Sequence, residues 1–281
     1  MAVLSHHIGR WTGYRVNGVG LASFAVVLAW AIVAIAAPWI TPHGVGEIVD
    51  YDYFGPLTAK FPLGTDYLGR DMLSRVLMGA RYTVGISLAA VAIACFAGVS
   101  LGMAAAVMGG WADSALSRLL DALNSIPSKL FGLVVVAGVG SSIPVLIMTL
   151  AIIYTPGAFR FARALAVNVN TMDFITVARI RGESLGYLIG SEILPNIVGP
   201  VFADVGLRFV FIVLLLSGLS FLGLGVQPPN ADWGALVREN IGGLSFGAPA
   251  VMAPSLAIAS LTIGGNLLID NLPQKIRDRS A

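Results

Sequence analysis

The chain has 281 residues, of which 57% are hydrophobic and only 11% are charged, and its mean hydropathy is +0.84. A soluble domain carries about 25% charged residues, so this composition indicates that lipid is the main solvent. The net charge of +2 is too small to indicate a nucleic-acid partner, and the single cysteine, Cys95, excludes an intrachain disulfide.

Six segments have the roughly 20 apolar residues that a helix needs to cross the hydrocarbon core. The first covers 19–40. It is longer than the apolar region of a signal peptide, about 7–15 residues, and this favours a retained helix, although Ala34 and Ala36 beside Pro38 give the small-residue pattern of a cleavage site. The other segments cover 84–108, 117–140, 144–165, 198–224 and 250–270. The third is amphipathic in its first half, and we expect it to bend near Pro127.

The spans predict an all-α membrane protein with an N-terminal segment, a first helix, a long loop, a five-helix core and a tail. Their ranges are 1–18, 19–40, 41–83, 84–270 and 271–281, and we expect a short interfacial helix in the loop. Lysine and arginine concentrate in cytoplasmic loops. With a cytoplasmic N-terminus, that side receives Arg10, Arg15, Arg118, Lys129, Arg160, Arg163, Arg179, Arg181, Lys275, Arg277 and Arg279. The outside receives Lys60, Arg70, Arg75, Arg81 and Arg238. Both termini are therefore predicted to be cytoplasmic, as is the polar loop at about 166–197.

Several residues carry local predictions. Asp204 and Arg208 are four residues apart in the fifth span and can pair on one helix face. Gly98 and Gly102 give the second span a packing face. In the loop, Asp66 can cap a turn before a short surface helix, with Arg70 paired to a nearby acid. After the fifth span, Pro228 and Pro229 are expected to stop the helix, and Trp233 suits the outer interface.

The polar segment between the fourth and fifth spans has a jointed pattern. Asp173 can cap a short helix, Gly182 breaks it, and Glu183 with Ser184 can start another. Pro195 is expected to redirect the chain before the fifth span. Such a segment can serve as a handle for a partner that moves the adjoining spans. An ordinary amphipathic interfacial loop is the alternative.

Four motifs carry a family resemblance. The spacing Ala178-x₃-Gly182-x₁₁-Leu194-Pro195 resembles the cytoplasmic-loop signature of bacterial ABC importer permeases. The chain departs from that signature where Thr176 and Val177 replace a Glu and an Ala, and where Glu192 replaces an Ile. The segments 61–81, 117–127 and 220–237 are similar to those of the C-type permeases of dipeptide, oligopeptide and nickel importers.

The resemblance implies a type I permease bundle in the bacterial cytoplasmic (inner) membrane. Its implied partners are a second homologous permease, two ATPase subunits and an extracytoplasmic solute-binding protein. It also implies that the loop couples to the ATPases, through Ala178, Arg179, Arg181, Gly182, Glu183, Ser184, Leu194 and Pro195. The solute stays open among dipeptides, oligopeptides, nickel chelates, opines and glutathione-like molecules.

Two motifs of nucleotide and metal chemistry are absent from the sequence. It lacks the Gly-x₄-Gly-Lys-Ser/Thr loop that cradles nucleotide phosphates, and it lacks His-Glu-x-x-His. The histidines, His6, His7 and His43, do not have the spacing of metal ligands. We therefore predict no catalytic residue, no metal and no cofactor bound by this chain, with ATP used by the partner subunits. A secondary carrier that works without ATP, or a membrane scaffold, is the alternative.

Overall fold

The structure is a computed structural model that describes residues 18–50, 52–246 and 249–271. The predicted N-terminal segment and C-terminal tail, with His6, His7, Lys275, Arg277 and Arg279, lie outside the described residues except for Gly18 and Asn271. The elements are α1 (Gly18–Ile40), α2 (Met72–Met108), α3 (Gly110–Asn124), α4 (Ser128–Val139), α5 (Ile143–Asn170), α6 (Asp173–Ile180), α7 (Leu185–Tyr187), the π-helix η1 (Leu188–Ile193), α8 (Leu194–Phe221), α9 (Trp233–Glu239), the 3-10 helix η2 (Ile241–Phe246) and α10 (Pro249–Asp270).

The helices agree with the predicted all-α class. Among the described residues, five helices are long and apolar enough to cross a membrane: α1, α2, α5, the run Leu185–Phe221 and α10. The pair α3 and α4 passes the same test together and is bent by 80° at the break between them. Pro127 is the residue before α4, so the predicted bend at this proline is confirmed.

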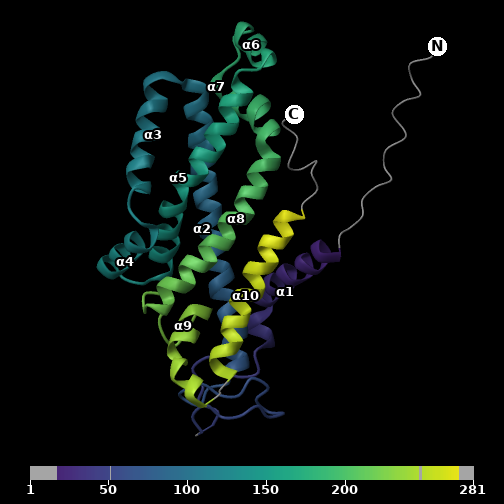
Figure 1. Ribbon diagram of the computed structural model, residues 1–281, viewed down its shortest axis with the longest axis vertical. Helices are drawn as coiled ribbons and strands as arrows, with labels where there is room; N and C mark the ends of the chain where they lie inside the picture. Colours follow the sequence, from purple (N-terminus) through teal and green to yellow (C-terminus); the bar gives the residue numbers. More distant parts are fainter. Residues whose placement is uncertain (1–17, 51, 247–248, 272–281) are drawn as a thin grey trace, which may run out of the picture.

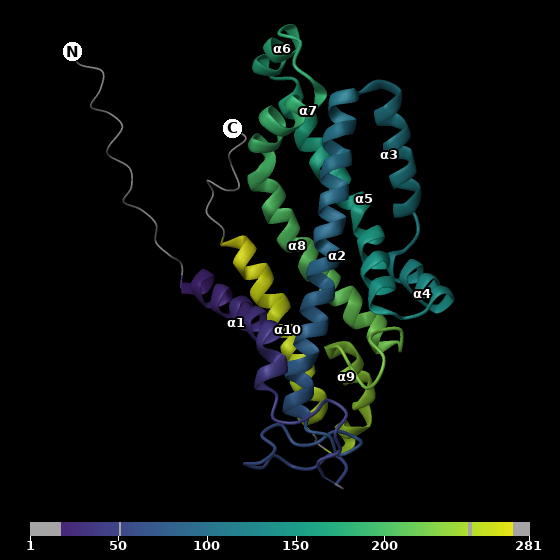
Figure 2. The same ribbon diagram turned by 180° about the vertical axis from the view of Figure 1, so that it is seen from behind.

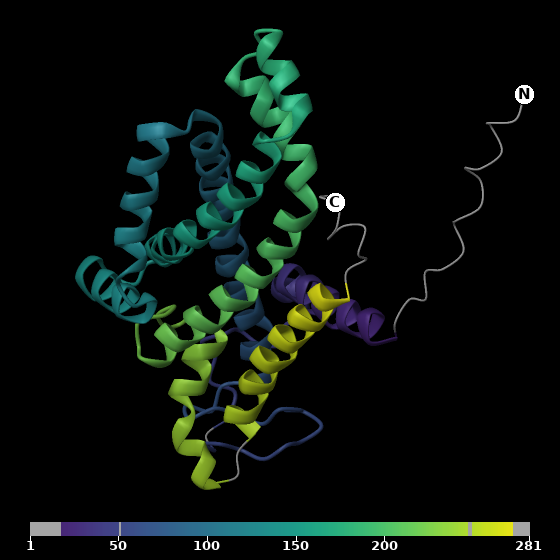
Figure 3. The ribbon, with the colours of Figure 1, turned by 45° about the horizontal axis from the view of Figure 1, so that its top comes forward.

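The helices form an elongated bundle in which α2, α5 and α8 run along the long axis (Figure 1). We call its two ends the α6 end, where α6 lies, and the loop end, where the 41–71 loop and α9 lie (Figures 1 and 2). Helices α1 and α10 lie together on the flank opposite α3 and α4 (Figure 3). Trp30 Nε1 of α1 donates a hydrogen bond to Ser260 Oγ of α10 at 3.0 Å, so α1 has specific contacts with the bundle.

Helices α2 and α5 approach each other closely at Gly98 and Gly102. A Cβ on Gly98 would lie 2.8 Å from the backbone oxygen of Thr155, and one on Gly102 would lie 2.7 Å from that of Phe159. Both contacts are shorter than real Cβ atoms make, so only glycine fits. The predicted packing face of the second span is confirmed, and it lies inside this chain against α5.

Helix α2 begins at Met72, well before the expected span start at residue 84. Asp71 caps it by accepting hydrogen bonds from the backbone N–H groups of Leu73 and Ser74. Arg75 and Arg81, which were expected in the loop, therefore lie in the helix. The turn before it leads into this long helix, and the expectation of a separate short surface helix there was wrong.

The end of α8 differs from prediction, because Gly223 and not the two prolines ends it. Gly223 has φ +92°, its N–H bonds to the Ser220 carbonyl, and the Leu224 N–H bonds to the Leu219 carbonyl. This is the Schellman pattern, which needs a left-handed residue best supplied by glycine. Pro228 comes several residues after the helix has stopped at Phe221.

Trp233 is fully buried, so its expected place at the outer interface was also wrong. Helix α9 folds back against the bundle, where Trp233 Nε1 donates to the Val76 carbonyl at 2.9 Å. The buried Asp232 caps α9 and accepts from Ser220 Oγ at 2.7 Å. Burial raises the pKa of the Asp232 carboxyl, while the hydrogen bonds from Ser220 and nearby backbone N–H groups act in the opposite direction.

Candidate functional site

Helix α6 projects beyond the long helices at one end of the bundle (Figures 1 and 2). Two of its residues, Ile175 and Ala178, are buried in a cluster formed with the ends of α2 and α5 and the start of the next helical run. These two positions are three residues apart and so share a helix face. Helix α6 is thereby anchored to the bundle although it lies outside the long spans.

The first residue of α6 is Asp173, and the cap position is Met172, which makes no side-chain capping bond. The prediction that Asp173 caps this helix was therefore wrong. Its carboxylate instead lies in the first turn, where negative charge interacts favourably with the helix dipole.

Gly182 ends the α6 turn as predicted. Its φ is +79°, its N–H bonds to the Arg179 carbonyl, and the Glu183 N–H bonds to the Ala178 carbonyl. These two bonds make a second Schellman turn. No atom lies within 4 Å of a Cβ built at Gly182, so crowding does not explain the glycine. Its positive φ does, because glycine adopts this angle without strain. The turn fixes the direction in which the chain leaves α6.

Ser184 starts the next helix, as predicted, and its Oγ accepts the Tyr187 N–H at 3.2 Å. From Leu185 the chain is helical to Phe221, a run of 37 residues. Pro195 lies inside this run, so the prediction that it redirects the chain was wrong. The π-helical turn Leu188–Ile193 ends two residues before Pro195, and wider turns of this kind accommodate the missing N–H and the ring of a proline.

The charged residues of the segment have different partners. Arg179 Nη2 donates to Asn170 Oδ1 at 2.8 Å and to the Val107 carbonyl at 3.3 Å, which ties α6 back to α5 and α2. Arg181 and Glu183 form an exposed ion pair at 3.6 Å. An exposed pair of this kind contributes little stability, so both charges stay available to another molecule.

The exposed face of α6 is apolar, which the sequence analysis missed. Phe174, Val177 and Ile180 lie three residues apart on one face and are 40%, 55% and 81% exposed. We call these three residues the apolar stripe. Their spacing was visible in the sequence, since DFITVARI has apolar residues on two helix faces. A small helix that buries one apolar face and exposes another fits a surface for protein contact.

The predicted coupling residues thus divide by environment. Arg179 lies in the last turn of α6, and Arg181, Gly182, Glu183 and Ser184 follow in the accessible turn beyond it. Ala178 is only 1% exposed and anchors the helix from within. Leu194 packs on the same buried cluster, and Pro195 is exposed in the following helix.

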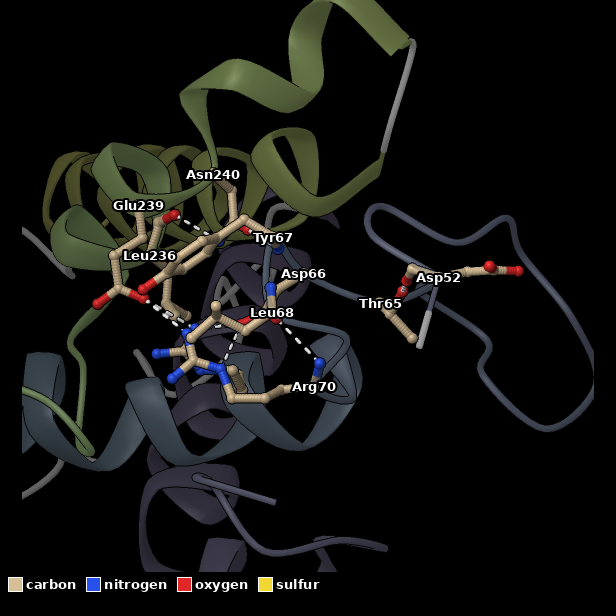
Figure 4. Close-up of polar contacts among 10 residues, drawn as sticks. Asp52, Thr65, Asp66, Tyr67, Leu68, Arg70, Leu236, Glu239 and Asn240 are labelled. Carbon is tan, nitrogen blue, oxygen red and sulfur yellow. Dashed lines mark hydrogen bonds and ion pairs between the residues drawn. The ribbon is translucent and has the colours of Figure 1, made fainter. Parts of the chain in front are cut away.

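The loop end has a second polar group, formed by Asp66, Arg70, Arg75 and Glu239 and here called the charge cluster (Figure 4). The predicted pairing of Arg70 with an acid is confirmed, because its Nε lies 2.7 Å from Asp66 Oδ2. The same guanidinium reaches Glu239 Oε2 at 3.1 Å. The cluster joins the start of α2 to the end of α9, so it serves the structure of the loop end.

No group of three or more metal-binding side chains occurs within the part of the chain that the structure describes.

Comparison with known proteins identifies the family. The profile described as "Binding-protein-dependent transport system inner membrane component" matches residues 98–278, which include α6 and its turn. The chain belongs to this family.

Its relatives are permeases. A glutathione transport system permease protein of Pectobacterium atrosepticum is 32% identical over 264 residues, covering 93% of this chain and 87% of the relative. A di/tripeptide transport system permease protein of Pseudomonas aeruginosa is 31% identical over 268 residues, covering 93% and 88%. A glutathione transport system permease protein of Salmonella typhimurium is 35% identical over 264 residues, covering 93% and 87%. The chain is thus a multi-pass inner-membrane permease of an ABC importer of the peptide family, as the motifs predicted.

Proposed function

We propose that this permease forms the translocation path together with a second homologous permease, and that two ATPase subunits drive the pair through α6 and its turn. A solute-binding protein delivers the solute at the loop end. The chain itself binds no cofactor and hydrolyses no ATP. The solutes are short peptides or glutathione-like molecules, a proposal that rests on the names of the relatives.

The apolar stripe carries this proposal. Ile180 is exposed beyond the ends of the long helices, where contact with water is unfavourable for its apolar side chain. Burial in a partner's cleft would stabilise the complex by about 25 cal/mol per Å² of apolar surface. The charged turn beside it supplies polar contacts around an apolar centre, an arrangement typical of protein interfaces. ATP can then bias the permease between two states if the ATPases hold α6 differently in each of them.

The proposed orientation places the α6 end in the cytoplasm. It is supported by the arginines of the α5–α6 region, Arg160, Arg163, Arg179 and Arg181, because positive residues favour the cytoplasmic side. The loop end then faces outward, where a binding protein can reach it.

Site-directed labelling tests the orientation. In a Cys95→Ala background, Ser184→Cys should react with a membrane-impermeant maleimide only after the cytoplasmic face is opened. Leu57→Cys, an exposed position in the 41–71 loop, should react from outside in intact spheroplasts. The reverse pattern would refute the proposed orientation.

Ile180→Glu tests the contact with the ATPases. The side chain is largely exposed, so the permease should fold normally, but a carboxylate desolvated in an apolar cleft should weaken ATPase association at least tenfold. Copurification of the ATPase subunits and ATP-dependent uptake of a dipeptide measure this effect. Leu57→Glu is the matched control for copurification of the ATPases, since it places the same charge at an exposed apolar position at the other end.

Unchanged copurification and uptake in Ile180→Glu would contradict the role of the apolar stripe. Uptake that proceeds without ATPase subunits, driven by a proton gradient, would instead support a secondary carrier.

A further inference from the structure

Helix α8 carries an ion pair inside a membrane-spanning run. Arg208 Nε lies 2.6 Å from Asp204 Oδ2, and its Nη2 lies 3.0 Å from Oδ1, so the guanidinium and the carboxylate meet through two parallel hydrogen bonds. The pairing predicted from their spacing is confirmed. Two charges in a span are costly, and such residues usually mark a path for ions or solutes.

The pair lies at mid-bundle depth. Arg208 Nη1 donates to the Tyr154 carbonyl of α5 at 3.4 Å, and the guanidinium also covers Gly157, near the middle of α5 (Ile143–Asn170). A Cβ on Gly157 would collide with Arg208 Nη1. The arginine is thus seated against a glycine surface on the facing helix, which fixes its position.

The pair is not sealed in the bundle. Both side chains keep 13% of their surface exposed, although they pack between helices. A charged surface that faced hydrocarbon would lose hydration without replacement, so charges in spans face the bundle interior or a water-filled cavity. The exposed edge of this pair is therefore better explained by a water-filled path than by lipid.

Arg208 also has N–H donors that its recorded hydrogen bonds do not use. A guanidinium has five N–H groups. The hydrogen bonds recorded among the described residues use three of them, two to Asp204 and a long one to Tyr154. A pair that served only to join α8 and α5 would need no exposed edge. A carboxylate is the ligand that the remaining planar donors match best.

We propose that Arg208 binds a carboxylate of the transported peptide-like solute, with Asp204 holding the guanidinium in place and facing the solute's ammonium group. Tyr154 flanks this site, since its hydroxyl donates to the Phe211 carbonyl at 3.0 Å and is thereby fixed against α8. This inference rests on the proposed import of short peptides. It adds that the path itself selects for a free carboxylate.

The test compares uptake of two probes by the complete complex in proteoliposomes, with its ATPases and binding protein. The probes are alanyl-alanine and its C-terminal amide, each at a concentration that saturates the binding protein. Arg208→Gln should lower ATP-dependent uptake of the dipeptide about tenfold and that of the amide less than twofold, because one charge-assisted hydrogen-bond pair is lost. Arg208→Lys should keep part of the preference.

A second variant separates recognition from helix packing. The double variant Asp204→Arg with Arg208→Asp keeps the ion pair within α8 and exchanges its two charges. If only this ion pair mattered, uptake of both probes would be restored. We expect the preference for the free carboxylate to stay lost. If Arg208→Gln does not assemble, this exchanged pair decides the question alone.

The outcomes distinguish the two proposals. Suppose that the unaltered complex shows ATP-dependent uptake. If Arg208→Gln then lowers uptake of both probes equally, or if the exchanged pair restores it fully, the carboxylate site is overturned and the importer function stands. If the unaltered complex shows ATP-dependent uptake of neither probe, the proposed function is overturned, and the carboxylate site is overturned as well.

Discussion

Arg75→Leu should lower the free energy of unfolding by about 3–5 kcal/mol, the usual cost of removing one partner from a buried ion pair. Arg75 is completely buried, and its Nη1 donates to Asp66 Oδ2 at 2.5 Å and to Glu239 Oε2 at 2.8 Å. Without it, two carboxylates share the single guanidinium of Arg70. Equilibrium unfolding in mixed micelles measures the change.

The charge cluster also contains buried polar atoms that lower its net contribution to stability. Within the described residues, Nε and Nη2 of Arg75 are buried without hydrogen-bond partners. Replacing all four charged residues by apolar ones of similar size should therefore cost less than Arg75→Leu alone. Arg118→Leu, at an exposed position of α3, is the matched control and should change stability by less than about 0.5 kcal/mol. Equal effects at Arg75 and Arg118 would show that the cluster does not hold the loop end together.

Gly98→Val should destabilise the bundle by about 3 kcal/mol, through overpacking of α2 against α5. The nearest atoms to a new Cβ include the Phe159 backbone nitrogen and the Thr155 backbone oxygen, both at 2.8 Å. Backbone atoms cannot turn aside as a flexible side chain can, so the two helices must separate. Unfolding in mixed micelles again gives the magnitude.

Gly85→Val provides the control on the same helix, since no atom lies within 4 Å of a Cβ there. Valine has a somewhat higher helix propensity than glycine, so this variant should be neutral or slightly stabilising. Similar losses at Gly85 and Gly98 would mean that helix propensity and not close packing sets the effect.

Periodicity and length predicted the features that follow from hydrophobicity. These are the six apolar spans, of which five are long helices and one is the bent pair α3 and α4, the break at Pro127, and the pair Asp204–Arg208. Helix ends were harder to predict. Asp71 starts α2 early and Gly223 ends α8, because backbone hydrogen bonding at caps decides these limits independently of hydropathy. Trp233 was placed at an interface because its burial depends on how α9 folds back, a tertiary contact.

The candidate site was found by spacing, but spacing does not say which side chains are covered. Ala178 matches the family signature and is buried, whereas Ile180 matches nothing in it and is the most exposed residue of the apolar stripe. The difference arises because α6 rests on the ends of α2 and α5, which are distant in sequence. Pro195 was misread for a similar reason, since the preceding π-helical turn accommodates it.

The unbroken helical run Leu185–Phe221 has a mechanical consequence. Its 37 residues correspond to about 55 Å at a rise of about 1.5 Å per residue, and it starts directly after the turn that follows α6. A stiff rod of that length amplifies rotation: a tilt of about 10° about one end displaces the other by about 10 Å. Under the proposed coupling to the ATPases, a modest rotation at the α6 end is therefore enough to move the loop end by about 10 Å, with no residue in between having to unfold.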